Sequence, residues 1–374
     1  MNAQSDTILH TSTHTNTLNI NKITKASLIL LYKIITNHSY LLKSIKNKKI
    51  LKITIKLDFN NIVDQRILIG HTHSVNTIIK LNQKTIASGG FDRSIKIWDY
   101  INGHFLKSLE GHTNSVTSIV KLSENQIASS SWDCSIKIWD FVQGYCLKTL
   151  TGHENYISCL TKVSKKNLAS GSWDRTVKIW VWHISKSNEN NTHNCIKTLN
   201  GHSGPIWCIL KVNQNQIASG SWDRTIKIWD VTEEISDKSN DKTNDFNNRR
   251  IDTDSICLRT LIGHDYYVKC LVKLNDTQIV SGSGDWNIKI WDFNSGECIN
   301  TIASNTDEVN CLIKLSNKLF ASGHWDKTIK IWNSKGDCLK ALNGHNGVVN
   351  CLIKLNENQI MSGSRDHTIK IWNI

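Results

Sequence analysis

Histidine, serine and aspartate, the residue types of general-base and nucleophilic catalysis, recur at fixed spacing in this chain of 374 residues. Seven copies of one pattern follow residue 60, each beginning at a Gly-His dipeptide or its replacement. Counted from the His position, a serine lies 17 residues on, an aspartate 21 and a tryptophan 27. Seven matches without an insertion or deletion make chance a poor explanation, so the chain is built from internal repeats.

The repeats begin 41, 41, 49, 62, 41 and 40 residues apart. The histidines are His71, His112, His153, His202, His264 and His345, and Ser304-Asn305 replaces Gly-His in the sixth repeat. The serines are Ser88, Ser129, Ser170, Ser219, Ser281, Ser322 and Ser362. The aspartates are Asp92, Asp133, Asp174, Asp223, Asp285, Asp326 and Asp366. The tryptophans are Trp98, Trp139, Trp180, Trp229, Trp291, Trp332 and Trp372.

Each repeat predicts four short β-strands. Segments such as Ser-Ile-Lys-Ile-Trp (94–98) alternate in polarity, as a strand with one buried face does. The other strands lie before Gly-His, after it and through Ala-Ser-Gly. A period near 40 residues with Gly-His and Trp-Asp is typical of a propeller, whose four-stranded sheets leave only short edges. We therefore expect an all-β, seven-bladed β-propeller.

These motifs resemble the WD40 family of β-propellers over residues 62–374. The resemblance implies that the His, Ser, Asp and Trp of each blade form a hydrogen-bonded structural tetrad. The chemistry fits, because indole only donates, carboxylate only accepts, and serine and neutral histidine do both. The histidines and aspartates are then structural and not catalytic dyads. In the sixth blade an amide replaces the ring, so we expect the weakest tetrad there.

No other motif indicates catalysis, a cofactor or a metal. The chain has no nucleotide-binding loop, no Gly-x-Ser-x-Gly and no His-Glu-x-x-His. Ten of the eleven cysteines form pairs thirteen residues apart, and no Cys-x-x-Cys occurs. We interpret the paired cysteines as small buried packing residues. We expect no enzyme, no cofactor and no metal, and a reducing compartment, the cytoplasm with the nucleus as an alternative.

The sequence divides into a basic extension, residues 1–60, and a propeller, residues 61–374. Nine lysines and two aspartates give the extension a charge of +7 out of the chain's +13. Apolar residues at near-helical spacing over 22–47 predict a helix in a partly disordered extension. We expect this helix to pack on the propeller or on a partner, with binding to a membrane surface as the alternative. A strand at 65–69 aligns with the fourth strand of other repeats and, as in the family, completes the last blade.

The resemblance places three positions of each blade around the top opening of the propeller. Aromatic residues dominate these positions, and they bury a large area with few rotatable bonds. The predicted partner-binding residues are Phe91, Trp132, Tyr156, Trp173, Trp207, Trp222, Tyr267, Trp325 and Arg365. The tryptophans either bind a partner or pack over the next side chain. Basic residues after the tetrad aspartates, such as Arg175, are either solvated or form cation–π pairs with the tryptophans. The resulting basic aromatic rim suits an acidic or phosphorylated peptide, because Arg binds carboxylate or phosphate through two hydrogen bonds.

A second ring consists of lysines nine residues after each His position. They are Lys80, Lys121, Lys162, Lys211, Lys273, Lys314 and Lys354. Near the bottom end of the inner strands, seven ammonium groups at a channel mouth would repel one another or hold an anion. We favour the alternative that they extend into solvent. Residues 185–193 and 232–255 are predicted to be polar loops on the same bottom face.

The pattern predicts a non-catalytic scaffold that binds a protein or peptide on the top face. One alternative is a substrate receptor of a ubiquitin-ligase complex, although residues 1–60 contain no convincing F-box. A second is an RNA- or ribonucleoprotein-associated propeller, suggested by the net charge of +13. AT-rich coding explains the many lysines more simply, so nucleic acid is not the expected partner. No apolar stretch reaches the about 18 residues of a membrane span.

Overall fold

The computed structural model describes residues 66–182, 194–232, 256–304 and 307–374. The chain divides into two units between Ile62 and Val63. The first unit, with the helix and the partial disorder predicted for residues 1–60, lies outside the described residues. The polar loop predicted at 185–193 and nearly all of the one at 232–255 lie outside them as well. All strands named below belong to the second unit.

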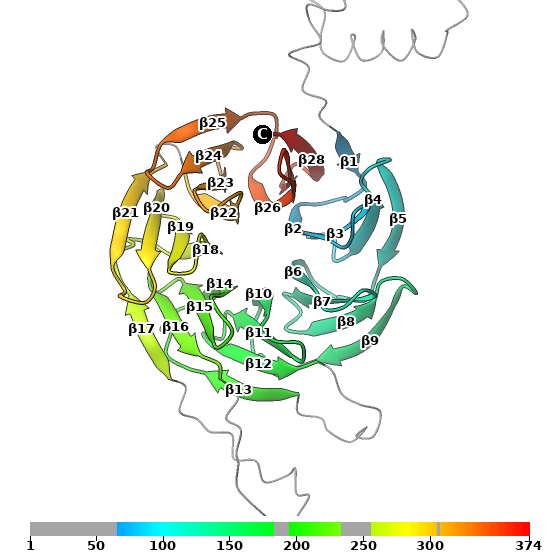
Figure 1. Cartoon of the computed structure of the whole chain (residues 1–374). Helices are drawn as coiled ribbons and strands as arrows, with labels where there is room; N and C mark the ends of the chain where they lie inside the picture. Colours follow the sequence, from blue (N-terminus) through cyan, green and yellow to red (C-terminus); the bar gives the residue numbers. More distant parts are fainter. Residues whose placement is uncertain (1–65, 183–193, 233–255, 305–306) are drawn as a thin grey trace, which may run out of the picture. The chain divides into compact units, whose positions relative to one another are not determined.

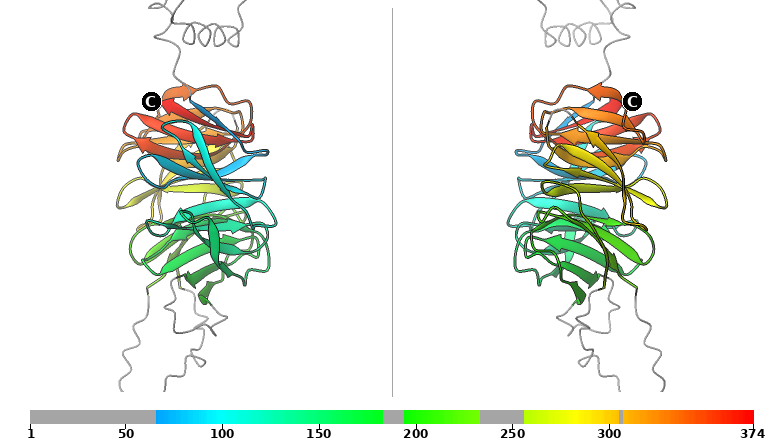
Figure 2. Two further views of the ribbon diagram at one scale, coloured as in Figure 1. Left: turned by 90° about the vertical axis from the view of Figure 1, so that its right-hand side faces the viewer. Right: turned by 90° about the vertical axis from the view of Figure 1, so that its left-hand side faces the viewer.

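In the described residues, twenty-eight strands form seven antiparallel sheets of four strands each. The sheets stand around a central axis like the blades of a propeller (Figure 1), and Figure 2 shows the same sheets from the side. The described residues form strands and turns and contain no α-helix. The prediction of an all-β, seven-bladed propeller is therefore confirmed. No helix that could cross a membrane occurs in this part of the chain.

The first four blades follow one another in chain order. Blade 1 consists of β2 (Val75–Lys80), β3 (Thr85–Gly90), β4 (Ile95–Asp99) and β5 (His104–Leu109). Blade 2 consists of β6 (Val116–Lys121), β7 (Gln126–Ser131), β8 (Ile136–Asp140) and β9 (Tyr145–Leu150). Blade 3 consists of β10 (Ile157–Lys162), β11 (Asn167–Ser172), β12 (Val177–Val181) and β13 (Cys195–Leu199). Blade 4 consists of β14 (Ile206–Lys211), β15 (Gln216–Ser221), β16 (Ile226–Asp230) and β17 (Cys257–Leu261).

The last three blades complete the ring. Blade 5 consists of β18 (Val268–Lys273), β19 (Gln278–Ser283), β20 (Asn287–Asp292) and β21 (Cys298–Ala303). Blade 6 consists of β22 (Val309–Lys314), β23 (Leu319–His324), β24 (Ile329–Asn333) and β25 (Cys338–Leu342). Blade 7 consists of β26 (Val349–Asn356), β27 (Gln359–Ser364), β28 (Thr368–Asn373) and, from the other end of the unit, β1 (Ile67–Ile69). The first strand of each blade lies nearest the axis (Figure 1).

The hydrophobic core lies between neighbouring blades. The second strand of a blade is almost fully buried, as in β3, whereas in the outermost strand β5 only Leu109 is buried. Ala87 and Ile95 of blade 1 pack in one cluster with Val116 and Ile127 of blade 2. Each sheet is thus covered by the next one, face to face as in a β-sandwich.

Strand β1 closes the ring. It pairs antiparallel with β28, with Leu68 opposite Ile369. Leu68 is 2% exposed and belongs to the same core cluster as Trp98 of blade 1, so it links the last blade to the first. The next residue, Ile69, points to the opposite face and is 75% exposed. The sequence predicts this strand at 65–69, and the structure has it at Ile67–Ile69.

Replacing Leu68 by alanine should destabilise the propeller by about 2–5 kcal/mol, because the change leaves a cavity where the first and last blades meet. Ile69→Ala, in the same strand, should change the stability by less than about 0.5 kcal/mol, because that side chain lies in solvent. Thermal and urea unfolding of both variants measure the difference. Equal midpoints for the two variants would show that β1 does not hold the ring closed.

Candidate binding surface

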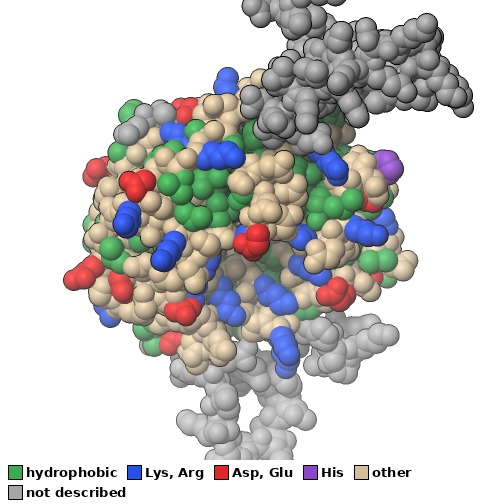
Figure 3. Space-filling view, turned by 45° about the horizontal axis from the view of Figure 1, so that its top comes forward, with side chains coloured by type: hydrophobic (Ala, Val, Ile, Leu, Met, Phe, Trp, Pro, Cys, Tyr) green, Lys and Arg blue, Asp and Glu red, His purple; other side chains and the backbone are tan. Residues whose placement is uncertain are grey.

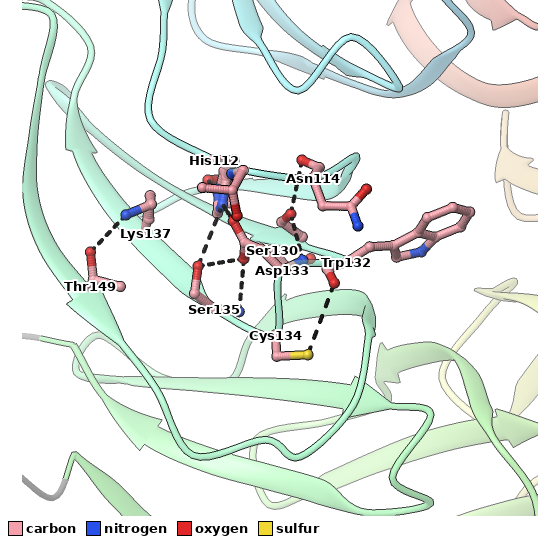
Figure 4. A network of polar contacts seen from close by, with 12 residues as sticks. His112, Asn114, Ser130, Trp132, Asp133, Cys134, Ser135, Lys137 and Thr149 are labelled. Carbon is pink, nitrogen blue, oxygen red and sulfur yellow. Dashed lines mark hydrogen bonds and ion pairs between the residues drawn. The ribbon is translucent and has the colours of Figure 1, made fainter.

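The tetrad residues form a continuous chain of hydrogen bonds. In blade 2 the indole N–H of Trp139 donates to Ser129 Oγ at 2.7 Å. His112 joins Ser129 through Nε2 and Asp133 through Nδ1, each at 2.7 Å, and Figure 4 shows His112 beside Asp133 and Ser135. Because a carboxylate only accepts, we assign the proton to Nδ1, and Nε2 then accepts from the serine hydroxyl. Each of these polar groups is therefore paired.

The same chain recurs in five other blades. The His–Asp, His–Ser and Trp–Ser distances are 2.6–2.8 Å in the blades of His71, His153, His202, His264 and His345. All the tetrad serines are fully buried, and these histidines are 5–6% exposed. A buried hydroxyl that is already bonded on both sides cannot reach a substrate. The repeated His-Asp pairs therefore serve the fold.

The tetrad aspartates also hold the turn between the second and third strands. Asp133 Oδ2 accepts from the backbone N–H of Thr113 at 3.0 Å, and Oδ1 accepts from Ser135 Oγ at 2.6 Å. Burial raises the pKa of Asp133, but the hydrogen bonds from His112 and Ser135 outweigh it and hold that pKa well below its usual range. The ionised carboxylate thus fixes the turn that presents Trp132.

The residue after each tetrad aspartate has a left-handed backbone conformation, with φ between 65° and 73°. These residues are Arg93, Cys134, Arg175, Arg224, Trp286, Lys327 and His367. The conformation costs a residue with a Cβ about 1 kcal/mol, and glycine would adopt it without this cost. Large basic or aromatic side chains nevertheless occupy six of the seven positions.

Blade 6 has a different polar centre from the one that the sequence predicts. His324, two residues after Ser322 on β23, directs Nε2 to the Ser322 hydroxyl at 2.6 Å. Trp332 donates to the same oxygen at 2.6 Å. The imidazole therefore comes from the second strand, while Asn305 lies outside the described residues. The sequence could have indicated this role of His324, because five other repeats have serine at the corresponding position.

The cysteines fall into two environments. On the inner strands, Cys159 and Cys270 are buried, and burial raises the pKa of the Cys159 thiol to about 12. On the outer strands, Cys146, Cys298 and Cys338 are exposed. The prediction that the paired cysteines are buried is therefore wrong for these three, because the fourth strand forms the outer edge of each blade. In the described part of the chain, no cluster of His, Cys, Asp and Glu could hold a metal ion.

An aromatic belt runs over the top face, the end of the propeller that carries the tetrad turns. Its members are Phe91, Trp132, Tyr156, Trp173, Trp207, Trp222, Tyr266 and Tyr267, with neighbouring ring centroids 4.5–6.3 Å apart. Phe91 meets Trp132 edge-to-face at 5.0 Å, and Trp132 stacks on Tyr156 at 5.3 Å. In blades 2 to 4 the ring before the aspartate packs on a ring at the start of the next blade's inner strand, whereas Phe91 of blade 1 packs on Trp132 itself, and the belt joins blades 1 to 5.

The belt packs on itself and is also open to solvent. Phe91 and Trp222 are each 43% exposed, and Tyr156 is 36% exposed. Trp132, Trp173 and Trp207 are half-buried. Tyr267, which the sequence predicts to bind a partner, is only 8% exposed, and its ring supports Trp222 at 5.0 Å. The exposed rings can contact a partner, and Tyr267 holds them in place.

Sequence reasoning missed two exposed aromatic residues of blade 5, Tyr266 and Trp286. Gly284 stands there in the position that carries an aromatic ring in five other blades. A Cβ on Gly284 would meet the rings of Tyr266 and Tyr267 at 2.6–2.8 Å. The adjacent tyrosines therefore fill the space from the neighbouring turn. The sequence feature that could have indicated this is the Tyr266-Tyr267 pair, which lies in the one repeat with Gly before its tetrad aspartate.

Lys269 extends the belt to blade 6. Its Nζ lies 5.6 Å from the ring centroids of Trp207 and Trp325 and 5.7 Å from that of Tyr267. The same Nζ lies 3.8 Å from Glu308 Oε2, and both side chains are about one fifth exposed. Burial lowers the pKa of Lys269, and the Glu308 carboxylate opposes this effect. A caged, ion-paired ammonium thus lies beside Trp325, which is 40% exposed.

The arginines that follow the tetrad aspartates make no cation–π contact with a ring of a described residue. Arg93, Arg175 and Arg224 are exposed and lie over no ring of a described residue, so the predicted cation–π pairs are wrong for them. The left-handed turn sets them apart from the belt. Arg365, the predicted binding residue of blade 7, is exposed as well. These guanidinium groups form a solvated rim beside the aromatic belt.

The stability of the propeller should fall as the pH drops from about 6.5 to about 4. Burial lowers the pKa of His324 to about 4, and Lys330 acts in the same direction, whereas the unfolded value is about 6.5. The unfolded chain then binds more protons in this window, so up to roughly 3 kcal/mol of stability is lost there. Thermal unfolding at pH 7.5, 6 and 5 measures this loss in the wild type and in His324→Gln.

The variant should be less stable at pH 7.5 and should show a flatter decline between pH 6.5 and 4. The tetrad aspartates do not interfere, because their pKa is lowered from 3.8 and their contribution is lost only below about pH 4. An equally steep decline in the variant would contradict the assignment to His324.

Comparison with protein families agrees with this architecture. The family model described as WD domain, G-beta repeat matches residues 63–99, 103–140, 144–181, 193–230, 255–292, 296–333 and 336–373. Each match ends one residue after a tetrad tryptophan. No curated protein matches the chain. Seven matched repeats that fold into seven blades show that the chain belongs to the WD40-repeat family, whose members are typically non-catalytic propellers that bind proteins.

Proposed function

We propose that this chain is a non-catalytic scaffold that binds a protein or peptide across the aromatic belt of its top face. The supporting observation is one contiguous aromatic surface, on which Phe91, Trp222 and Trp325 are each 40–43% exposed. Exposed aromatic rings contribute strongly to binding because they bury a large area and lose few rotamers. The hydrogen-bonded tetrads below hold the turns rigid, so binding requires little reorganisation.

An acidic or phosphorylated segment is the partner that we favour. Arg93, Arg175 and Arg224 are exposed at corresponding turns of blades 1, 3 and 4. A guanidinium binds carboxylate or phosphate through two parallel hydrogen bonds. Lys269 is paired with Glu308 at 3.8 Å, so the exposed arginines are the cations open to such a partner. Rings that bury apolar side chains and cations that select acidic groups would act together.

Roles as a ubiquitin-ligase substrate receptor or in a ribonucleoprotein would use the same top face. No particular contact of the described residues favours either over a general scaffold. All eleven cysteines are free, which supports a reducing compartment, the cytoplasm or the nucleus.

The double variant Trp222→Ala/Trp325→Ala should lose partners that the wild type retains, with affinities at least about 30-fold weaker, as for two central aromatic anchors. Its unfolding temperature should fall only slightly, because both rings are about 40% exposed. Affinity purification with mass spectrometry, run in parallel, measures the loss. Tyr145→Ala, which removes a 55% exposed ring from outer strand β9, is the matched control. Retention of every partner by the folded double variant would contradict the assignment to the belt.

The acidic character of the partner is tested separately, with Arg175→Gln/Arg224→Gln. This variant should weaken binding of acidic or phosphorylated peptides from the captured partners by about tenfold, and raising the salt concentration should erase the difference. Lys137→Gln/Lys289→Gln removes the same charge from the third strands of blades 2 and 5 and should have little effect. Peptide binding that is insensitive to both the arginines and salt would overturn this part of the proposal.

A further inference from the structure

Seven lysines, which we call the lysine ring, lie at the end of the central channel opposite the aromatic belt. They are Lys80, Lys121, Lys162, Lys211, Lys273, Lys314 and Lys354. Each lies at or near the end of the innermost strand of its blade. All seven side chains are half-buried, and Lys121, Lys273 and Lys354 are 26–30% exposed. For the five whose Nζ atoms bond to backbone carbonyl oxygens, this corrects the interpretation that the lysines extend into solvent.

Hydrogen bonds to the neighbouring blade hold most of the ring in place. Lys121 Nζ lies 2.8 Å from the carbonyl oxygen of Leu81, and Lys80 Nζ lies 2.8 Å from that of Leu355. The corresponding bonds in three other blades join Lys162 to Leu122, Lys211 to Val163 and Lys354 to Leu315. An ammonium group has three N–H donors. Each of these five lysines is therefore fixed at the seam between two blades and retains donors for a ligand.

The charge at this end of the channel is not balanced. The turns after the seven inner strands add Lys84, Lys165, Lys166 and Lys318, against only Glu124, Asp276 and Glu357. On these strands and turns eleven basic side chains face three acidic ones, and Asp99, Asp140, Asp230 and Asp292, at the ends of third strands, add four carboxylates at the same end of the propeller. The three acids are 86–103% exposed, so solvent screens their pairing with the ring. The aspartates that end the third strands, such as Asp99, accept hydrogen bonds from their own turns.

We propose that the lysine ring binds a small molecule that carries several phosphate groups. Figure 3 shows a hollow at the centre of the face that it draws, with Lys and Arg side chains gathered around it. Half-buried ammonium groups around a channel mouth are reached by a compact anion that enters the mouth, and a flat protein surface would meet the exposed turns first. A phosphate group carries up to two charges at neutral pH, so a compact molecule with several phosphate groups would bring many acceptor oxygens and negative charges among the seven lysines. Lysine serves such a ligand as a point charge.

Inositol hexakisphosphate is the probe, added to the full chain and followed by calorimetry and by thermal unfolding. The wild type should bind it, and binding should raise the unfolding temperature, because a ligand of the folded state stabilises that state. Lys273→Gln/Lys314→Gln should bind it about tenfold more weakly, through the loss of two charge-assisted donors. Neither lysine makes a hydrogen bond to the carbonyl of a neighbouring blade among the described residues, so this variant keeps the seam bonds.

Lys137→Gln/Lys289→Gln is the matched control, because it removes the same charge from the third strands, where these lysines bond to Thr149 and Thr301. Its affinity for the probe should stay within about twofold of the wild type. Vesicles with and without a multiply phosphorylated inositol lipid separate the two sources of such a ligand. If the vesicles with this lipid bind and Lys273→Gln/Lys314→Gln weakens that binding, the ligand is a lipid headgroup. If only the free probe shows this behaviour, the ligand is a soluble metabolite. No binding by the wild type, or an equal loss in the control, overturns the proposal, and neither result bears on the top-face partner.

Discussion

Each blade depends on a buried chain of hydrogen bonds that runs from an indole N–H through a serine hydroxyl and an imidazole to a carboxylate. In blade 2 this chain joins the third strand at Trp139, the second strand at Ser129 and the two adjoining turns at His112 and Asp133. A buried polar network stabilises a fold only when all its members are paired, because one unpaired group costs more than a single bond contributes. The turns that carry the aromatic belt are therefore positioned by this network.

Blades 5 and 6 show that the network and the belt need a side chain of the right type and size, which a different position of the repeat can supply. In blade 6 the Ser322 hydroxyl receives an imidazole from His324 on its own strand. In blade 5 the ring missing at Gly284 is replaced by Tyr266 and Tyr267 from the neighbouring turn, and the space left by glycine is the space that they occupy. Blade 5 keeps an aromatic surface, and blade 6 keeps the bonds to its serine, through a compensating change elsewhere in the repeat.

These compensations set the limit of what the sequence could predict. The fixed spacing is sufficient to predict the seven blades, because the repeats place their strands and their tetrad positions in the same order. It could not identify His324 or Tyr266, because each departs from the repeat. The direction in which the ring lysines point could not be predicted, for another reason. Each innermost strand has an irregular register near its start, between Val75 and Thr77 in blade 1. A bulge adds one residue to one side of the pair and breaks the alternation from which facing is inferred.

The two ends of the channel differ because each inner strand contributes different chemistry at its two ends. At the top, β18 begins beside Tyr267 and contributes Lys269, whose charge is surrounded by rings and paired with Glu308. At the other end the same strand finishes at Lys273, whose only ionic partner among the described residues is the exposed Asp276. The first cation is largely compensated within the protein, and the second is not. The two proposals therefore rest on different chemistry at the two ends of one strand: aromatic rings around a paired cation at the top, and lysines with little ionic pairing at the other end.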